Sequence, residues 1–200
     1  SDFALWKAWD KDDGDVYWET EIGKGRPGWH IECSAMSTKY LGNHFDIHAG
    51  GIDLIFPHHQ NEIAQSEGAT GEKFVNYWLH ASHLIVDGKK MSKSASNFYT
   101  LRDLLQKGKD PIVVRYLFLS THYRQQLNFT FEALDGVSNA IERLNNFMTM
   151  LRSANGEGNE KVKSIVDKAV KGFESAMDDD LNTPEAIAHI FELVREVNSI

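Results

Sequence analysis

The order of apolar and polar residues divides the chain near Asp110-Pro111 into two parts of different character. Before this point the apolar runs are short, glycines interrupt them, and most of the histidines occur here. After it, apolar residues recur every three or four positions, which is the spacing of one face of an α-helix. The pattern therefore predicts an α/β part over residues 1–110 and a helical part over residues 111–200.

Two short runs in the first part predict β-strands. Residues 45–48 alternate apolar and polar positions and lead into Ala49-Gly50-Gly51, where we expect a loop that turns tightly or approaches a ligand. Residues 83–86 form the second predicted strand, and the turn pair Asp87-Gly88 should end it.

Capping residues mark the expected helix starts. Pro57 suits the first position of a helix that runs to about Ser66, and Thr100 with Asp103 is similar to a capping box. Asp110 and Thr130 are expected to cap the helices that follow them. In the second part, three apolar stripes predict a bundle of three helices joined by short loops, with the stripes as its core. The stripes run from Leu134 to Leu151, from Val162 to Met177 and from Ile187 to Val197.

Composition and charge narrow the class of protein. The chain has 21 Lys and Arg against 29 Asp and Glu, a net charge of -8, which excludes binding of nucleic acid through uniform positive charge. No apolar run approaches the roughly 20 residues of a membrane span. The single cysteine, Cys33, excludes an internal disulfide and favours the cytoplasm. Because the chain begins at Ser1 without an initiator methionine, we expect a fragment.

Three residues could bind a metal ion. His58 and Glu62 are four positions apart on the helix predicted to begin at Pro57, so one face of that helix can direct both to one ion. Cys33 could add a thiolate, and this donor set suits zinc better than magnesium or calcium. His59 is a rival ligand, although it should point about 100° away from His58. The alternative is structural, with Cys33 a small buried residue and the His-x-x-x-Glu pair on a solvated helix face.

Two loops could bind a nucleotide. Residues 89–97 hold three lysines with serine hydroxyls among them, which could fold over a polyphosphate, or simply form a solvated basic loop. In 48–53, glycines after a strand could admit a nucleotide and Asp53 could accept from ribose hydroxyls, although the spacing is not that of a full GxGxxG motif. The turn at 25–28 presents Trp29, which could equally be a core residue.

Together these segments resemble a known family. Lys90-Met91-Ser92-Lys93-Ser94 is the KMSKS sequence of class I aminoacyl-tRNA synthetases. The segments 28–36, 56–66 and 178–186 are similar to those of the cysteinyl-tRNA synthetases in that class, and the resemblance extends from about Asp2 to Ile200.

The resemblance implies an α/β fold, the C-terminal half of a Rossmann-type catalytic domain, followed by an α-helical bundle region that leads to an anticodon-binding domain. It implies activation of cysteine by ATP with Mg²⁺ to cysteinyl adenylate, and transfer of the cysteinyl group to tRNA(Cys). Lys90 and Lys93 would stabilise the phosphates in the transition state. The adenylate would be lined by His48, Gly50, Gly51 and Asp53.

The resemblance also implies one Zn²⁺ that binds the substrate thiolate, with Cys33, His58 and Glu62 as three of its four protein ligands. Trp29 would wall the cysteine pocket. The fourth ligand of the family is a cysteine nearer the N-terminus, and this sequence has no second cysteine and no His-Ile-Gly-His element. We therefore expect this chain alone to be inactive. We further expect a cytoplasmic monomer without membrane contact.

Two other functions remain open. A related cysteine ligase uses the same adenylate chemistry to join cysteine to an amino sugar, and transfer to tRNA would separate the two. The chain could also be a non-catalytic, synthetase-like binding module, which the presence of both lysines and all three candidate ligands argues against.

Overall fold

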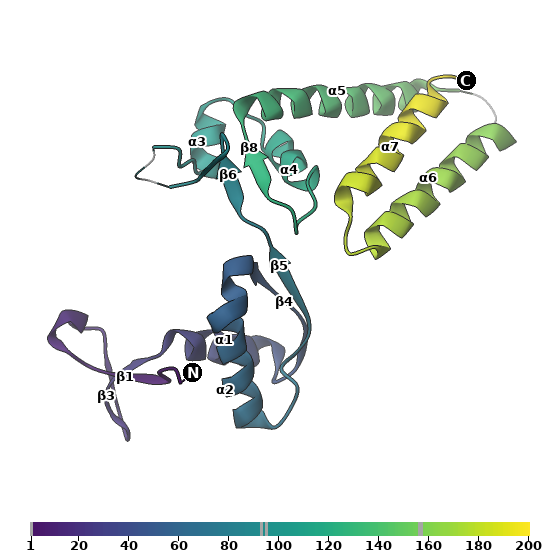
Figure 1. Ribbon diagram of the computed structural model, residues 1–200. Coiled ribbons are helices and arrows are strands. Elements are labelled where there is room, and N and C mark those ends of the chain that lie inside the picture. Colours follow the sequence, from purple (N-terminus) through teal and green to yellow (C-terminus); the bar gives the residue numbers. More distant parts are fainter. Residues whose placement is uncertain (1, 93, 95, 156–157) are drawn as a thin grey trace. The chain divides into compact units, whose positions relative to one another are not determined.

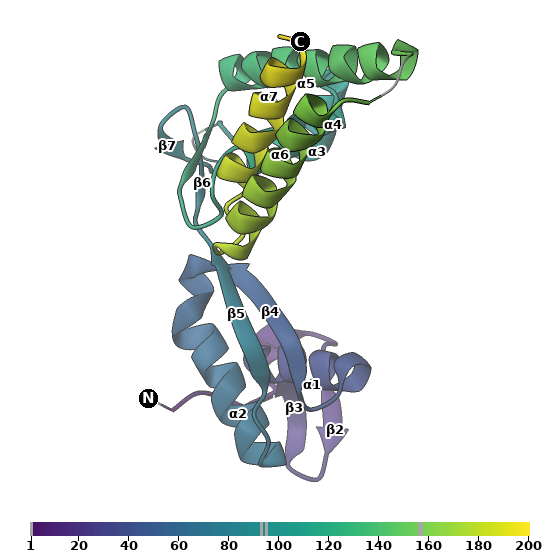
Figure 2. The same ribbon diagram turned by 90° about the vertical axis from the view of Figure 1, so that its right-hand side faces the viewer.

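A computed structural model describes residues 2–92, 94, 96–155 and 158–200, and the chain divides into two compact units, Ser1–Ala81 and Ser82–Ile200. Figures 1 and 2 show the elements of each unit from two directions. The candidate metal site lies in the first unit and the KMSKS loop in the second, so each is described within its own unit.

The first unit begins with a small antiparallel sheet of strand order β1-β3-β2. Its strands are β1 (Trp6–Ala8), β2 (Trp18–Thr20) and β3 (Gly23–Pro27), and a 3-10 turn, η1 (Lys11–Asp13), precedes β2. Gly25 is required where the strands meet, because a Cβ atom there would lie 2.2 Å from the carbonyl oxygen of Lys7. The sheet leads directly into helix α1 (Trp29–Leu41).

A β-α-β unit follows and holds the candidate site. Strands β4 (Phe45–Gly51) and β5 (Val75–Ala81) pair in parallel, and the connection between them contains η2 (Ile52–Leu54), the π-type turn η3 (Ile55–His59) and helix α2 (Gln60–Thr70). Helices α1 and α2 meet through a buried hydrogen bond of 2.8 Å between the hydroxyls of Ser34 and Ser66. Phe45, Phe74 and Val75 form the small apolar core.

Two sequence predictions in this unit are wrong. The expected loop at 49–51 is the end of β4, because Ala49, Gly50 and Gly51 continue the parallel ladder with residues 79–81. The helix expected from Pro57 to Ser66 begins at Gln60 and ends at Thr70. Phe56 has extended dihedrals (φ -137°, ψ 131°), as the crowding of a residue by a following proline favours, and this separates the turn from the helix.

The second unit contains a three-stranded sheet of order β7-β6-β8 and two short helices. The strands are β6 (Leu84–Val86), β7 (Lys89–Lys90) and β8 (Leu127–Phe129). Asp87 and Gly88 both have positive φ (49° and 72°) and form the predicted two-residue turn, as in a type I′ hairpin. The predicted caps are confirmed at both helices, with a capping box of Thr100 and Asp103 before α3 (Leu101–Gln106) and Asp110 before α4 (Pro111–Leu119).

Three longer helices complete the second unit. They are α5 (Phe131–Ser153), α6 (Glu160–Asp178) and α7 (Thr183–Val197). Helices α6 and α7 lie side by side as an antiparallel hairpin (Figure 2). The first half of α5 packs elsewhere, since Leu134 and Val137 belong to one apolar core with α4, β6 and β8. The helical region is thus present as predicted, but the core of α5 is only partly that of a three-helix bundle.

The compact units divide between Ala81 and Ser82. The predicted division into domains at 1–110 and 111–200 stays a prediction. Within the described ranges, none of the helices has the length and hydropathy needed to cross a membrane.

Candidate metal and nucleotide site

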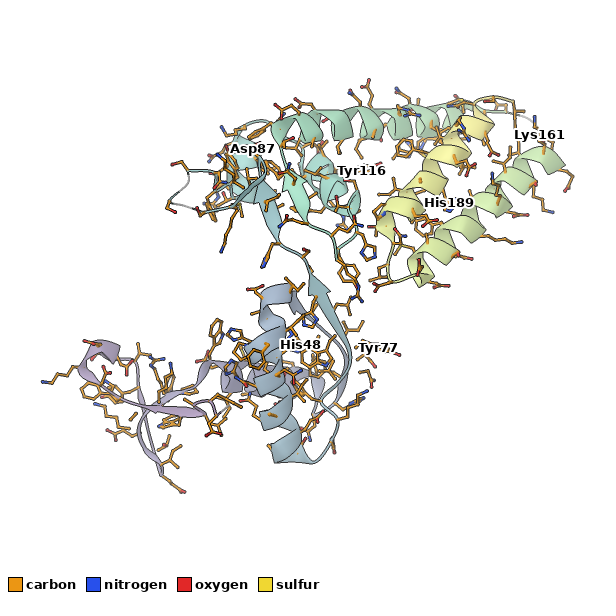
Figure 3. The ribbon with its side chains drawn as sticks, viewed as in Figure 1. His48, Tyr77, Asp87, Tyr116, Lys161 and His189 are labelled. Carbon is orange, nitrogen blue, oxygen red and sulfur yellow. The ribbon has the colours of Figure 1, made fainter. Side chains whose placement is uncertain are left out.

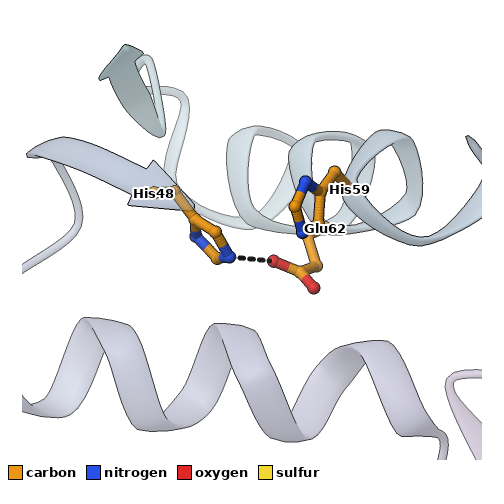
Figure 4. Close-up of side chains that lie close together, drawn as sticks. All are labelled: His48, His59 and Glu62. Atoms are coloured by element: carbon orange, nitrogen blue, oxygen red, sulfur yellow. Dashed lines mark ion pairs between the residues drawn. The ribbon is translucent and has the colours of Figure 1, made fainter. Parts of the chain in front are cut away.

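The end of β4 and the start of α2 bring together two imidazoles and a carboxylate. Ligand atoms of His48, His59 and Glu62 all lie within 4.8 Å of one another, and within the described part of the chain this is the group of His, Cys, Asp and Glu that meets this distance. Figure 4 shows His48 reaching from the strand towards Glu62 on the helix. In Figure 3, His48 lies among the side chains between strands and helices of the first unit.

Glu62 is the centre of this group and is buried, with 4% of its surface exposed. Its Oε2 atom is enclosed and has no hydrogen-bond partner among the described residues, although Nε2 of His48 approaches to 3.4 Å. Burial raises the pKa of the Glu62 carboxyl, because a buried carboxylate is costly without a compensating charge. An unpartnered buried carboxylate oxygen is the kind of atom that a cation would satisfy.

Cys33 reaches the same carboxylate from α1. The pKa of its thiol is raised first by burial and then by the nearby Glu62 charge. The pair therefore favours a protonated thiol beside the carboxylate in the absence of a cation. A bound metal ion would reverse this preference, because coordination stabilises the thiolate.

His59 belongs to an array of stacked rings. Its Nδ1 atom lies 2.8 Å from Nε2 of His80 on β5, and the rings of His48 and Trp78 stack beside it with centroids 4.8 Å apart. Burial, followed by the neighbouring imidazoles, lowers the pKa of His59 to about 4, so the ring is neutral. Gly50 makes the space for this ring, since a Cβ atom there would lie 2.8 Å from Cε1 of His59.

The predicted trio of Cys33, His58 and Glu62 is only partly assembled. Cys33 lies near enough to Glu62 for the carboxylate charge to raise the pKa of the thiol, whereas Nδ1 of His58 lies 3.0 Å from Nε2 of His30 and its ring meets that of Trp29. His58 occupies the π-type turn before α2, whereas the prediction placed it in one regular helix with Glu62. We expected His59 to face away from the ligand pair, and the structure instead places it beside Glu62.

The residues predicted to line the adenylate follow one another at the end of β4. His48, Gly50 and Gly51 are in the strand and Asp53 is in the adjoining 3-10 turn, at the carboxyl end of parallel strands where α/β folds bind ligands. Gly51 admits the Asp53 carboxylate, because a Cβ atom at Gly51 would lie 2.4 Å from Oδ1. Trp29 is 62% exposed at the start of α1, and its role in a cysteine pocket stays a prediction.

The KMSKS loop follows β7 in the second unit. Lys90 ends the strand and is exposed, and Met91 and Ser92 are partly buried after it. Lys93, the other predicted catalytic residue, lies outside the described residues. Lys90 therefore begins the loop from a fixed strand, while its role towards phosphate stays a prediction.

The residues present fit a zinc ion by two observations. The thiol, imidazole and carboxylate donors are those that zinc prefers, and the buried Oε2 atom of Glu62 lacks a partner among the described residues. Cys33 and Glu62 would hold the ion, and three imidazoles are near enough in the fold to be considered with them. These are the rings of His48, His58 and His59.

Sequence reasoning did not find the roles of His80 and Trp78, or the hydrogen bond between His30 and His58. The available signal was the concentration of histidines before Asp110. The pairing itself depends on the parallel register, which sets His48 opposite Trp78 and Gly50 opposite His80.

Comparison with known proteins gives the family. The model of the class I (C) tRNA synthetase catalytic domain matches residues 1–139, and that of the DALR domain matches residues 172–200. The cysteine–tRNA ligase of Brachyspira hyodysenteriae is 57% identical over an alignment of 203 positions, which covers 100% of this chain and 43% of the relative. That of Protochlamydia amoebophila is 54% identical, over 100% of this chain and 42% of the relative.

A solved structure shares the fold. The crystal structure of the ternary complex of Agrobacterium radiobacter K84 agnB2 LeuRS, tRNA and LeuAMS superimposes with a TM-score of 0.70 and 16% identity, and covers 94% of this chain and 30% of that one. The chain spans less than half the length of the curated relatives it matches. The matched residues 1–139 include both the group of His48, His59 and Glu62 and the KMSKS sequence. The resemblance found in the sequence is therefore confirmed: the chain belongs to the family of the class I (C) tRNA synthetase catalytic domain.

Proposed function

We propose that the full-length protein is a cysteine–tRNA ligase that activates cysteine with ATP and transfers the cysteinyl group to tRNA(Cys). The observation that carries the choice of cysteine is the buried Glu62 carboxylate with the Cys33 thiol near it. Such a pair can hold a thiophilic metal, and a metal can select a thiol substrate. Family membership and the cysteine–tRNA ligase relatives support the ATP and tRNA parts of the proposal.

In the first step the carboxylate of cysteine attacks the α-phosphate of ATP, forming cysteinyl adenylate and releasing pyrophosphate. We assign Lys90 and Lys93 to stabilise the negative charge that spreads over the phosphates in the transition state. His48, Gly50, Gly51 and Asp53 would line the adenylate at the end of β4. In this assignment the end of β4 would hold the nucleotide, and the two lysines would act on its phosphates together with bound Mg²⁺.

Selection of cysteine would be the task of the metal site. A bound Zn²⁺ would supply a thiophilic centre for the substrate thiolate, which a serine hydroxyl imitates poorly at neutral pH. Cys33, His58 and Glu62 are the proposed protein ligands, and Trp29 would enclose the side chain. Direct recognition of sulfur can exceed the roughly 1–3 kcal/mol that a pocket gains from sensing one methylene group, so no editing step is needed.

Cysteine-dependent exchange of pyrophosphate into ATP, followed by transfer of radiolabelled cysteine to tRNA(Cys), tests the proposal in the full-length protein. We expect both activities, and a cytoplasmic monomer. Exchange without transfer to tRNA, but with transfer to an amino sugar, would identify the related cysteine ligase. Absence of both activities in the zinc-loaded protein would indicate a binding module.

Lys93→Ala provides a sharper test of the assigned roles. We expect it to slow adenylate formation with little change in cysteine affinity, because the lysine acts on charge that develops in the transition state. Single-turnover measurement with titrated cysteine separates the two quantities. An equal loss of cysteine binding in the ground state would refute the role.

A further inference from the structure

One side chain closes the start of the KMSKS loop. Oδ1 of Asn97 accepts a hydrogen bond from the backbone N–H of Ser92 at 2.9 Å, and Nδ2 of Asn97 donates to the carbonyl oxygen of Lys90 at 3.2 Å. A single amide therefore holds the backbone on both sides of Met91. Such side-chain bonds to the backbone fix a loop in the way that turn hydrogen bonds do.

Two further features hold the same segment. Met91 lines an apolar cavity of about 300 Å³ together with Val86, Val114 and Phe129, so its side chain is anchored on the core of the second unit. Before Asn97 the chain reverses at Ser96, which has a left-handed φ of 53°. Residues other than glycine rarely adopt this conformation, and here it returns the chain towards Lys90.

From this geometry we propose that Asn97 is a positioning residue of the KMSKS loop, which presets the backbone from Lys90 to Ser92 and so the direction in which Lys90 approaches phosphate. The expected effect on catalysis rests on the proposed function, whereas the two hydrogen bonds are observed in the loop itself. Asn97 acts through the loop backbone and has no assigned contact with substrate.

The physical reason is pre-organisation. Lysine side chains have many rotamers, and a loop of free backbone would have to be ordered at the moment of reaction. Two hydrogen bonds and an anchored methionine fix the backbone in advance, which leaves only the side chains to be ordered by the nucleotide. Removal of the Asn97 amide should therefore lower the rate of adenylate formation and leave cysteine binding unchanged.

Hydrogen exchange tests the loop geometry directly in the full-length protein. Asn97→Ala should speed exchange of the Ser92 amide, and Asn97→Asp should protect this amide better than Asn97→Ala because it retains the acceptor. Asn155→Ala is the matched control, since it removes an exposed asparagine that donates to the local backbone at Ser153, outside the loop, and it should leave both exchange of the Ser92 amide and activity within about twofold of the parent. Unchanged exchange of Ser92 in Asn97→Ala would overturn the proposal whatever the activity of the protein.

Kinetics test the consequence. In cysteine-dependent pyrophosphate exchange we expect Asn97→Ala to lower kcat by about 10- to 100-fold, as misplacement of a catalytic group does, with the KM for cysteine and the melting temperature unchanged. With Lys90→Ala the losses should be far from additive, because both changes act on one element. Fully additive losses, or a rise in the KM for cysteine alone, would overturn the positioning role. If the parent protein lacks pyrophosphate exchange activity, the proposed function is refuted. Hydrogen exchange at the Ser92 amide would still test the loop geometry independently.

Discussion

The ring of His59 occupies the place that any side chain on Gly50 would need. A Cβ atom at Gly50 would lie 2.8 Å from Cε1 and 3.0 Å from Nε2 of His59, and 2.9 Å from a methyl group of Leu54. His59 cannot easily give way, because its other ring nitrogen is held by His80 at 2.8 Å. The glycine that the family resemblance assigns to the adenylate thus also shapes the histidine array.

Gly50→Ala should therefore destabilise the full-length protein, by about 1–3 kcal/mol, as overpacking in a close-packed site does. The measurement is the shift in the urea unfolding midpoint. Gly136→Ala is the control, because the space around Gly136 on α5 is open and alanine in a helix is favoured over glycine by roughly 0.5–1 kcal/mol. Stability of Gly50→Ala equal to that of the parent would contradict the close packing of His59.

The identity of the metal-binding imidazole is a second question at this scale. If Cys33, His58 and Glu62 are the ligands, Glu62→Gln and His58→Ala should both lose zinc by elemental analysis, whereas His59→Ala should retain it. Glu72→Gln is a matched control on an exposed carboxylate outside the site. Retention of zinc in His58→Ala with loss in His48→Ala and His59→Ala would assign the ion to the group that lies within 4.8 Å.

At the scale of elements, one acidic residue joins the α6–α7 hairpin to the segment before β8. Asp180 accepts a 2.5 Å hydrogen bond from the Tyr123 hydroxyl, pairs with the Arg124 guanidinium, and its carbonyl oxygen lies 3.0 Å from Nε2 of His122. Asp180 has a left-handed φ of 55° in the turn between the helices. These contacts connect the segment 178–186 to the residues that lead into β8.

The pH dependence of this junction follows from its charges. The hydrogen bond and charge of Arg124 hold the pKa of the Asp180 carboxyl below its usual value, so the folded protein binds fewer protons here than the unfolded chain. Its stabilisation is present above the ordinary carboxyl pKa and is lost as the pH falls through the lowered one. We therefore expect the melting temperature of the parent to fall more steeply towards acid pH than that of Asp180→Asn.

Asparagine tolerates the left-handed conformation, so Asp180→Asn removes the charge with little backbone cost. Asp179→Asn is the control, since within the described ranges no ion pair or side-chain hydrogen bond involves Asp179. A melting curve of Asp180→Asn with the same acid slope as the parent would show that the ion pair does not contribute.

Local signals in the sequence predicted the elements that depend on neighbouring residues. The caps at Thr100, Asp110 and Thr130 and the Asp87-Gly88 turn lie where they were expected, because each depends on a few adjacent side chains. The start of α2 was missed, since the proline that favours a first helical turn also extends the residue before it.

The candidate site was predictable only in part, because some of its contacts depend on residues that are distant in the sequence. Cys33 lies near Glu62, and their role as ligands stays a prediction, whereas the partners of His58 and His59 are set by the pairing of β4 with β5 and by contacts with α1. Register between strands 30 residues apart is a non-local property, and no spacing within one segment encodes it.

At the scale of the whole molecule, the first unit exposes a face that parallel sheets normally cover. Ile47 and Tyr77 are opposite each other in β4 and β5 and are 58% and 68% exposed, and Figure 3 shows Tyr77 pointing away from the helices. Parallel sheets are usually covered on both faces. In the full-length protein we expect other parts of the chain to cover this face and to steady the strand that carries His48.

Zinc binding should therefore differ between this chain and the full-length protein. The chain has one cysteine, so at most one thiolate is available to a metal for which the family resemblance implies two, and each missing ligand weakens a tetrahedral site. After dialysis against a weak chelator we expect about one zinc ion per full-length protein and much less than one per 200-residue chain, as measured by elemental analysis of both. Addition of Glu62→Gln to the full-length protein should reduce its zinc content to the level of the chain. Equal, stoichiometric zinc in the chain and the full-length protein would show that the residues of this chain complete the site alone, and would favour an imidazole of the His48 and His59 group as the further ligand.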